Sequence, residues 1–213
     1  MREKENSARV VLVRHAEPDF PIDRVYCDSS EDPGITPLGE AQAKEVANSL
    51  KDIDVAAIFS SPLLRTKLTA EYIDQWHSVE VVYDERLKER SLGVWDGLFF
   101  NEVEGQYPEE YRSWKKDQAG FAPQGGETAY DLLARVKPVI VDLVDRFKGR
   151  TVVVVCHVGP IRVLLADALG LPINKFRNLR IDPASVACVD YGCTQNNLIM
   201  MNFVGNARLV NIL

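Results

Sequence analysis

The stretch RVVLVRH, residues 9–15, decides how the rest of the sequence is interpreted. It begins as an aliphatic, mostly β-branched run without polar alternation, which is typical of a strand buried on both faces. Arg14 and His15 follow where this run ends. The run TVVVVC, residues 151–156, is of the same kind and is followed directly by His157. Two buried strands are therefore each predicted to end in a histidine.

Other segments place these two strands in an α/β protein. Further strands are predicted near residues 55–59, 79–83, 186–191 and 198–204, and helices near residues 37–50, 62–76, 128–147 and 160–169. Strands that alternate with helices indicate βαβ units and a mostly parallel sheet. We expect a three-layer αβα sandwich that forms one domain over residues 1–213, with residues 98–125 as a lid-like insertion.

Two of the predicted helices carry start signals. Thr36-Pro37 combines an N-cap residue with a proline at the first helical position, and Ser60-Ser61-Pro62 has the same form. A third helix, over residues 128–147, contains Pro138, which we expect to kink or strain it.

Polar side chains converge at one edge of the predicted sheet. Ligands of such sheets bind beyond the carboxyl ends of the strands. His15 and His157 follow two strands, and Arg65 lies one turn into the helix after a third. Taken singly, each has a plain alternative, as a structural histidine or a solvated arginine. Together with Arg14 they would crowd positive charge, which costs free energy unless an anion lies among them. A phosphate dianion would satisfy this cluster, because arginine offers planar, bidentate donors.

Such a cluster supports phosphoryl transfer to a histidine. A neutral imidazole can attack phosphorus through one nitrogen while a hydrogen bond holds the other. Neighbouring positive charge lowers the pKa of the ring and helps to keep it neutral. The arginines and the second histidine would stabilise the phosphoryl oxygens, and a nearby carboxyl group would protonate the leaving alkoxide. This chemistry requires no metal and no cofactor. The third histidine, His77, lies at a helix end and is assigned no role.

Composition excludes several other classes. The net charge of −6 and a pI of about 5.2 argue against binding of nucleic acid or a membrane surface through bulk charge. Three histidines cannot build a His-rich metal cage, and the four cysteines form no CxxC pair. The longest apolar runs are too short to span a bilayer, and the first residues show no signal segment. We therefore expect a cytoplasmic protein without a metal site.

Six motifs in sequence order resemble those of the histidine phosphatase superfamily, in its phosphoglycerate mutase-like branch. They are Arg14-His15-Ala16-Glu17, Thr36–Ala43 (TPLGEAQA), Ser60–Ala70 (SSPLLRTKLTA), Leu87–Gly97 (LKERSLGVWDG), Gly125-Gly126-Glu127-Thr128 and Val155–Arg162 (VCHVGPIR). Any one of them is a weak signal, but six in order across most of the chain make a strong one.

The resemblance implies roles for individual residues. His15 would be the phosphorylated nucleophile, and Arg14, Arg65 and His157 would bind the phosphoryl group. Glu89 would act first as the general acid for the leaving group and then as the base that activates water. The acid phosphatase and phytase branch instead has an acid directly after the second histidine, where this chain has Val158. Without the motif, Glu89 would be interpreted as a surface carboxylate in a charged run.

The sequence departs from the family pattern at four positions. Ala16 replaces the usual glycine and Cys156 the usual serine, and both are small residues. Pro21 stands where the family often has an asparagine that helps to hold phosphate. Cys27 lies in the loop where a glycine often stands, as a harmless thiol or as a reactive one near the pocket.

Within the branch, the sequence favours a phosphatase over a mutase. The mutases resemble a longer chain with an insertion that excludes water, and they tend to read ERHYG after the acid. Here the segment after Glu89 keeps Arg90, a candidate to bind a second acidic group of the substrate, but lacks the histidine and tyrosine. The alternatives that stay open are a phosphoglycerate mutase-type transferase and a non-catalytic phospholigand-binding protein.

The expected partner is a small-molecule phosphate monoester. In length the chain resembles α-ribazole phosphatases and broad-specificity phosphatases of the branch, and its motifs do not distinguish them. Substrate-reading residues should lie within the insertion, between Phe99 and Gln124, where aromatic side chains either stack on a ring or pack the lid. The oligomeric state cannot be read from the sequence.

Overall fold

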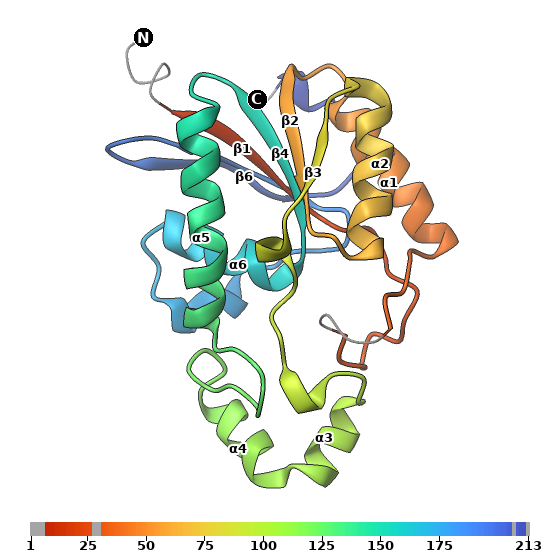
Figure 1. Cartoon of the computed structure of the whole chain (residues 1–213), viewed down its shortest axis with the longest axis vertical. Helices are drawn as coiled ribbons and strands as arrows, with labels where there is room; N and C mark the ends of the chain where they lie inside the picture. Colours follow the sequence, from red (N-terminus) through yellow and green to blue (C-terminus); the bar gives the residue numbers. More distant parts are fainter. Residues whose placement is uncertain (1–6, 27–30, 206–207, 212–213) are drawn as a thin grey trace.

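The computed structural model describes residues 7–26, 31–205 and 208–211. It contains one six-stranded sheet in the order β3-β2-β4-β1-β5-β6 (Figure 1). The strands are β1 (Ala8–Arg14), β2 (Val55–Ser60), β3 (Val81–Tyr83), β4 (Thr151–Cys156), β5 (Val186–Tyr191) and β6 (Asn196–Phe203). The helices are α1 (Pro37–Leu50), α2 (Leu64–His77), α3 (Phe100–Gln106), α4 (Pro108–Lys116), α5 (Ala129–Arg146) and α6 (Val158–Ala168). Short 3₁₀ turns include η2 (Glu85–Leu87), η3 (Gly93–Trp95) and η4 (Ile173–Asn178).

The sheet is mostly parallel, as the alternation of strands and helices predicts. β1, β2, β3 and β4 pair in parallel, whereas β5 runs antiparallel to β1 and β6 antiparallel to β5. Only residues 192–195 join β5 to β6, which is too short a link for the crossover that parallel neighbours need. The predicted α/β class is confirmed, with an antiparallel pair at one side of the sheet.

The central strands are buried on both faces because helices cover both. In β1, Val11 packs against α1 and α2, whereas Val10 and Leu12 face α5 and α6. Figure 1 shows these two helix pairs on opposite sides of the sheet. The alternation repeats in β4, and the core residues of both strands are fully inaccessible to solvent. Continuous aliphatic runs, rather than alternating ones, therefore suit these strands.

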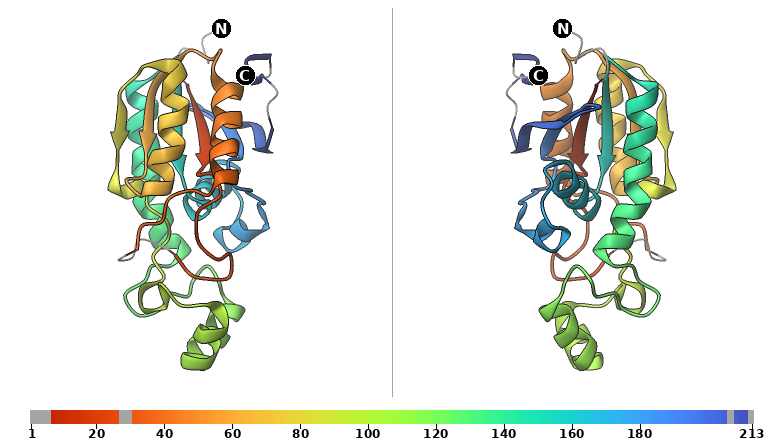
Figure 2. Two further views of the ribbon diagram at one scale, coloured as in Figure 1. Left: turned by 90° about the vertical axis from the view of Figure 1, so that its right-hand side faces the viewer. Right: turned by 90° about the vertical axis from the view of Figure 1, so that its left-hand side faces the viewer.

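The segment that holds α3 and α4 extends beyond the sheet (Figure 2). Its aromatic side chains pack on one another: Trp114 lies edge-on to Trp95, with ring centroids 6.0 Å apart, and is stacked on Phe100 at 5.7 Å. Trp95 is fully buried, and Phe121 lies 5.6 Å from it. Of the two alternatives for these aromatic residues, packing describes this cluster, which gives the segment a small core of its own.

Hydrogen bonds from Arg90 fasten this segment to the rest of the fold. Its Nε donates to the carbonyl of Glu127 at 2.8 Å, and its Nη1 and Nη2 donate to those of Gln118 and Phe121 at 2.8 and 2.6 Å. Three backbone acceptors thus account for the burial of this guanidinium, because a buried charge is tolerated only where it is hydrogen-bonded. The network gives Arg90 a structural role and leaves the predicted substrate contact as a prediction.

The start of one helix differs from expectation, and another helix accommodates an internal proline. α2 begins at Leu64 rather than Pro62, and its first backbone N–H donates to the carboxylate of Asp32 at 2.9 Å. The cap therefore comes from a distant loop instead of the serines that precede the helix. α5 continues through Pro138 without a break in its assignment. Pro138 is on the exposed side, where water can satisfy the carbonyl of Ala134 that the ring leaves unbonded.

Within the described ranges, none of the helices combines the length and the apolar character that a bilayer crossing requires.

The backbone at Gly93 generates a first prediction. Its φ of +51° lies in the left-handed region, and a Cβ here would lie 2.1 Å from the carbonyl oxygen of Gln124 and 2.5 Å from the nitrogen of Gly126. Gly93→Ala should lower the free energy of unfolding by at least about 2 kcal/mol, because it adds left-handed strain to a clash with backbone. Urea unfolding measures this loss.

Gly105 in α3 provides the matched control. An added Cβ would meet nothing within 4 Å there, and the residue is helical. Gly105→Ala should raise stability by up to about 1 kcal/mol. Equal stability of Gly93→Ala and the natural protein would contradict the proposed packing at the base of the α3–α4 segment.

Candidate active site

The register between β1 and β4 brings the two strand-end histidines together. The strands pair in parallel with Arg14 opposite Cys156, and the backbone N–H of His15 donates to the carbonyl of Cys156 at 3.0 Å. His157 directly follows Cys156 in the sequence. The ring centroids of His15 and His157 lie 5.1 Å apart, and both side chains are buried. Two residues that are 142 positions apart in the sequence (157 − 15) thus become neighbours at one sheet edge.

A hydrogen bond determines which nitrogen of His15 carries the proton. Its Nδ1 lies 2.8 Å from the carbonyl oxygen of Ala16, and a carbonyl only accepts. Nδ1 is therefore the donor, so Nε2 of the neutral ring keeps its lone pair. Burial, followed by the charges of Arg65 and Arg14, holds the pKa of His15 well below its usual value. The ring is thus neutral at pH 7, with one nitrogen available to react.

His157 is oriented by a serine. Its Nε2 lies 2.9 Å from Oγ of Ser61, which follows β2, and its Nδ1 is buried with no hydrogen-bond partner among the residues described. Burial lowers the pKa of His157 strongly, and the charges of Arg65, His15 and Arg14 lower it further. A buried nitrogen without a partner is rare in folded proteins and points to a ligand. The hydroxyl of Ser61 also accepts from the backbone N–H of Leu63 at 3.4 Å, so it contacts both the start of α2 and the histidine.

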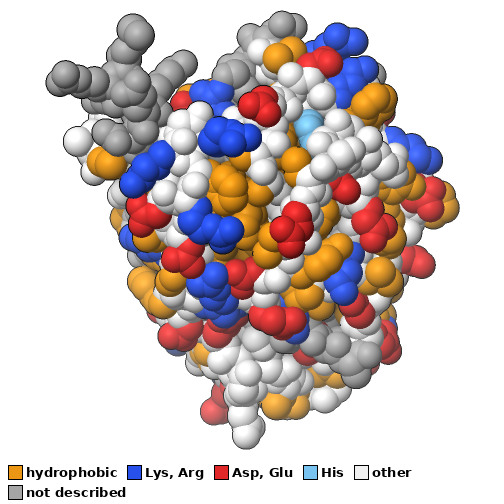
Figure 3. All heavy atoms as spheres, turned by 45° about the horizontal axis from the view of Figure 1, so that its top comes forward, with side chains coloured by type: hydrophobic (Ala, Val, Ile, Leu, Met, Phe, Trp, Pro, Cys, Tyr) orange, Lys and Arg blue, Asp and Glu red, His pale blue; other side chains and the backbone are white. Residues whose placement is uncertain are grey.

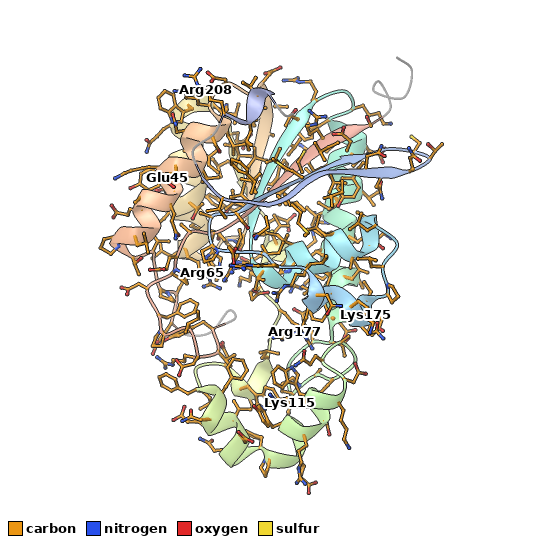
Figure 4. The ribbon with its side chains drawn as sticks, turned by 180° about the vertical axis from the view of Figure 1, so that it is seen from behind. Glu45, Arg65, Lys115, Lys175, Arg177 and Arg208 are labelled. Atoms are coloured by element: carbon orange, nitrogen blue, oxygen red, sulfur yellow. The ribbon has the colours of Figure 1, made fainter. Side chains whose placement is uncertain are left out.

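Two arginines complete the cluster. Arg14 donates from Nη1 to the carbonyl of Ile181 at 2.8 Å, and its buried Nε has no hydrogen-bond partner in the described part of the chain. Arg65, in the first turn of α2, is 2% exposed and lies a loose 3.9 Å from a carboxylate oxygen of Asp32. It lies where the sheet faces the α3–α4 segment (Figure 4). The pKa of Arg14 is lowered by burial, so its charge lies in poorly solvated surroundings.

Thr69 connects Ala16 to the first turns of α2, a role that sequence reasoning did not predict. The backbone N–H of Ala16 donates to Oγ1 of Thr69 at 3.0 Å, and that hydroxyl donates to the carbonyl of Arg65 at 2.8 Å. This chain of bonds couples the position of the His15 loop to that of Arg65. The signal was present, since Thr69 belongs to the motif that begins at Ser60.

Glu89 lies at the start of α6, next to His157. Its carboxylate accepts from the backbone N–H of Gly159 at 3.1 Å and from that of Arg90 at 2.7 Å. Nη2 of Arg135, on α5, donates to the carbonyl of Glu89 at 3.1 Å and so holds its backbone. A Cβ on Gly159 would lie 2.2 Å from Oε1 of Glu89, so only glycine permits this approach. A carboxylate at a helix N-terminus is also favoured by the helix dipole.

A cavity of about 180 Å³ adjoins this centre. It opens beside Glu89 and Gly159 and reaches Phe100 and Trp114 of the α3–α4 segment. It is also lined by arginines, namely Arg24, Arg90, Arg162 and Arg177. The cavity thus lies on the Glu89 side of the two histidines and is not lined by their rings.

The remaining predicted positions fall outside the cluster. Pro21 is exposed and has no polar side-chain atom, so it cannot take over the phosphate contact of an asparagine. Cys27 lies outside the described residues. Within residues 7–26, 31–205 and 208–211, no three His, Cys, Asp or Glu side chains are grouped as metal ligands.

The positive charge at the site is local. On the described part of the face seen in Figure 3, basic and acidic side chains are interspersed rather than gathered into one basic surface. The overall charge of −6 is thus compatible with a cationic pocket, because it averages over the whole chain.

Comparison with known proteins identifies the family. The sequence profile of the histidine phosphatase superfamily (branch 1) matches residues 10–204. This chain belongs to the histidine phosphatase superfamily. The resemblance predicted from its six motifs is therefore confirmed.

Relatives within this superfamily include both phosphatases and mutases. Phosphoserine phosphatase 1 of Hydrogenobacter thermophilus is 34% identical over 91% of this chain and 92% of its own length. A probable phosphoglycerate mutase of Escherichia coli, GpmB, is 32% identical over 86% of this chain and 85% of its own.

Solved structures show the same fold. Mycobacterial glucosyl-3-phosphoglycerate phosphatase superposes with a TM-score of 0.81 at 29% identity, over 94% of this chain and 99% of that one. It has also been solved with inorganic phosphate. A putative α-ribazole-5′-phosphate phosphatase of Escherichia coli has a TM-score of 0.85 over 95% and 98% of the chains. At 24% identity, it shows the fold alone.

The two buried histidines predict how stability depends on pH. Their folded-state pKa values are lowered, whereas in the unfolded chain they are near 6.5. Below that pH the unfolded chain binds protons that the folded one does not, so stability is complete above about pH 6.5 and is lost as the pH falls. Each histidine contributes a slope of up to about 1.4 kcal/mol per pH unit.

Urea unfolding between about pH 7 and pH 5 measures this slope. The double variant His15→Gln, His157→Gln should show a shallower slope, because the carboxylate contributions stay and those of the histidines are removed. Equal slopes in the natural protein and the double variant would show that the rings are not held neutral.

Proposed function

We propose that this protein is a metal-independent phosphomonoesterase that acts through a phosphohistidine on His15. The observation that carries the proposal is the state of that ring, a buried neutral imidazole whose Nδ1–H is bonded to Ala16 and whose Nε2 is free to attack. Arg14 and Arg65 supply the positive charge that a phosphoryl group needs, and His157 adds a neutral hydrogen-bond donor.

In the first step, Nε2 of His15 attacks phosphorus and the bond from phosphorus to the ester oxygen breaks. Glu89, which enters as the carboxylic acid, gives its proton to the departing oxygen, so that an alcohol leaves. The guanidinium groups of Arg14 and Arg65 stabilise the charge on the phosphoryl oxygens as the bond transfers. The product is His15 phosphorylated at Nε2 and an ionised Glu89.

In the second step, a water molecule replaces the alcohol. Glu89 accepts a proton from this water. The oxygen of the water attacks phosphorus, and the bond between phosphorus and Nε2 of His15 breaks. Inorganic phosphate leaves, and both His15 and Glu89 return to their starting protonation states. One carboxyl group can serve both steps because Gly159 and Arg90 hold it at the start of α6.

His157 supports the transfer as a neutral donor. A phosphoryl oxygen only accepts hydrogen bonds, so Nδ1 of His157 must carry the proton to contact one. Nε2 then accepts, and the hydroxyl of Ser61, 2.9 Å away, can donate to it. Ser61 is thus a positioning residue that selects the tautomer of His157.

We favour hydrolysis over mutase activity, because the cavity that Glu89 lines offers water a route to the carboxylate that would activate it. A mutase must keep water from its phosphohistidine, whereas a phosphatase must admit it. We infer that residues 98–125 act as a lid-like wall within a single domain, since Phe100 and Trp114 line this cavity. Isotopic label moving between positions of phosphoglycerate faster than phosphate is released would favour the mutase.

For the substrate, we infer a small phosphate monoester. Relatives that exceed 25% identity include proteins named for phosphoserine, phosphoglycerate and glucosyl-3-phosphoglycerate. Support for α-ribazole phosphate is limited to the fold, so we do not favour it. Cys156 and Cys188 are buried free thiols, which supports the proposed cytoplasmic setting.

Turnover of an aryl phosphate tests the nucleophile. With a metal chelator present, the natural protein should release phosphate, and His15→Ala should reduce kcat by roughly three orders of magnitude or more. His77→Ala is the matched control, because His77 lies at the end of α2 and should leave kcat unchanged. No turnover, or unchanged turnover in His15→Ala, would refute the proposal, and tight phospholigand binding without turnover would support a binding protein instead.

The leaving group tests the proton donor. Glu89→Gln should lower kcat for an alkyl phosphate by about 10²–10⁴-fold. The loss should be smaller for p-nitrophenyl phosphate, because p-nitrophenolate leaves without a proton. Glu85→Gln is the control, since Glu85 lies in the same charged run but its exposed carboxylate, among the residues described, pairs with Lys88 alone. Equal losses on both substrates would show that Glu89 does not protonate the leaving group.

A further inference from the structure

The proposed function, on which this inference rests, indicates which part of the substrate would occupy the cavity beside Glu89. His15 takes the phosphoryl group and Glu89 protonates the ester oxygen, so the remainder of the substrate must lie beyond Glu89. The cavity of about 180 Å³ begins at that point. It is smaller than the roughly 300–1,000 Å³ of pockets for drug-sized ligands, and so it fits a compact leaving group.

Arg162 faces this cavity from α6. Its Nε donates to the carbonyl of Leu179 at 2.8 Å, which fixes the orientation of the guanidinium. No ion pair joins it to a carboxylate within the described ranges, and its terminal nitrogens make no hydrogen bond to the residues described there. Burial lowers its pKa, as does the charge of Arg177. The two guanidinium groups are therefore close enough to repel each other.

Arg177 faces the same cavity from η4. Its guanidinium lies 5.5 Å from the ring centroid of Trp114, and in the part of the chain that is described it makes neither a hydrogen bond nor an ion pair. Figure 4 shows it between η4 and the α3–α4 segment, apart from Arg65 of the phosphoryl site. Two guanidinium groups thus line one small cavity, in which Glu89 is the one carboxylate among the described lining residues. Because neither guanidinium pairs with Glu89 directly, a ligand anion would find unused donors there.

The other arginines that line the cavity already have partners. Arg24 pairs with Glu31 at 3.5 Å and donates to the carbonyl of Gly97 at 2.6 Å. Arg90, which the sequence pointed to for a second acidic group, donates to three backbone carbonyls. Among the four arginines of this cavity, Arg162 and Arg177 therefore have the most capacity to bind an anion.

We propose that Arg162 and Arg177 form a second anion site, which binds a carboxylate on the leaving group of the substrate. The preferred substrates are then small phosphate monoesters in which a carboxylate lies a few bonds from the ester oxygen. Arginine matches the planar carboxylate with paired donors, and the small cavity favours this group over a bulkier second phosphate. The ring face of Trp114 lies 5.5 Å from the guanidinium of Arg177 and supports it through a cation–π contact.

Two probes that differ only in the carboxylate test this site. 3-Phosphoglycerate and glycerol 3-phosphate are both three-carbon phosphate monoesters, and a hydroxymethyl group replaces the carboxylate in the second. Calorimetry in the His15→Ala background measures their dissociation constants without turnover. 3-Phosphoglycerate should bind about tenfold more tightly or better, as expected for a charge-assisted contact. Adding Arg177→Gln should reduce this ratio about tenfold, toward one.

Lys175→Gln is the matched control, because Lys175 lies on η4, is exposed, carries the same charge and does not line the cavity. It should leave the ratio unchanged. A ratio near one in the His15→Ala background, or equal effects of Arg177→Gln and Lys175→Gln, would overturn the proposal. Tighter, Arg177-dependent binding of 1,3-propanediol bisphosphate would also overturn it and would assign the site to a second phosphate.

Aryl phosphate turnover by the natural protein, measured in parallel, separates this inference from the proposed function. Normal turnover together with equal dissociation constants for 3-phosphoglycerate and glycerol 3-phosphate would refute the carboxylate site and leave the phosphatase activity supported. No turnover together with an Arg177-dependent preference for 3-phosphoglycerate would support the anion site and refute the proposed hydrolysis.

Discussion

The parallel pairing of β1 with β4 is the constraint on which the rest of this site depends. It sets Arg14 opposite Cys156, and the residue after each strand is then a histidine. Both strands are buried on both faces, so a slip of the register would disturb two helix layers at once. The precision of the 5.1 Å approach of His15 to His157 thus comes from the central sheet and not from the loops that carry the two rings.

Burial performs a second task at this edge, because it keeps both imidazoles neutral. A protonated His15 would have no lone pair to offer, and a protonated His157 would add to the charge of the arginines. Nε of Arg14 and Nδ1 of His157 are buried without a hydrogen-bond partner among the described residues, and phosphoryl oxygens would give both an acceptor. The large aliphatic core stabilises the fold enough to maintain such an arrangement.

The site also divides its work between two parts of the fold. In the proposed mechanism, the sheet edge holds the residues that bind the phosphoryl group, whereas η4, α6 and the α3–α4 segment line the cavity that would take the leaving group. Much of this could be predicted from the sequence, because aliphatic runs identify β1 and β4 and the motifs mark Glu89. The roles of Arg90 and Arg177 could not, because they depend on which backbone carbonyls and carboxylates lie near each guanidinium in space. The contact between Ser61 and His157 could not be predicted for the same reason, since local sequence shows a serine at a helix start but not its distant partner.

The central claim is that a neutral His15 accepts the phosphoryl group at Nε2. Rapid acid-free quenching of a turnover mixture, followed by mass spectrometry of the His15 peptide and ³¹P–¹⁵N NMR of the trapped protein, tests it directly. If His15 is the nucleophile, it should carry an acid-labile phosphoryl group that is bonded to Nε2 and disappears as phosphate is released. Turnover without a phosphoprotein, or a phosphoryl group on Nδ1 or on another residue, would contradict it.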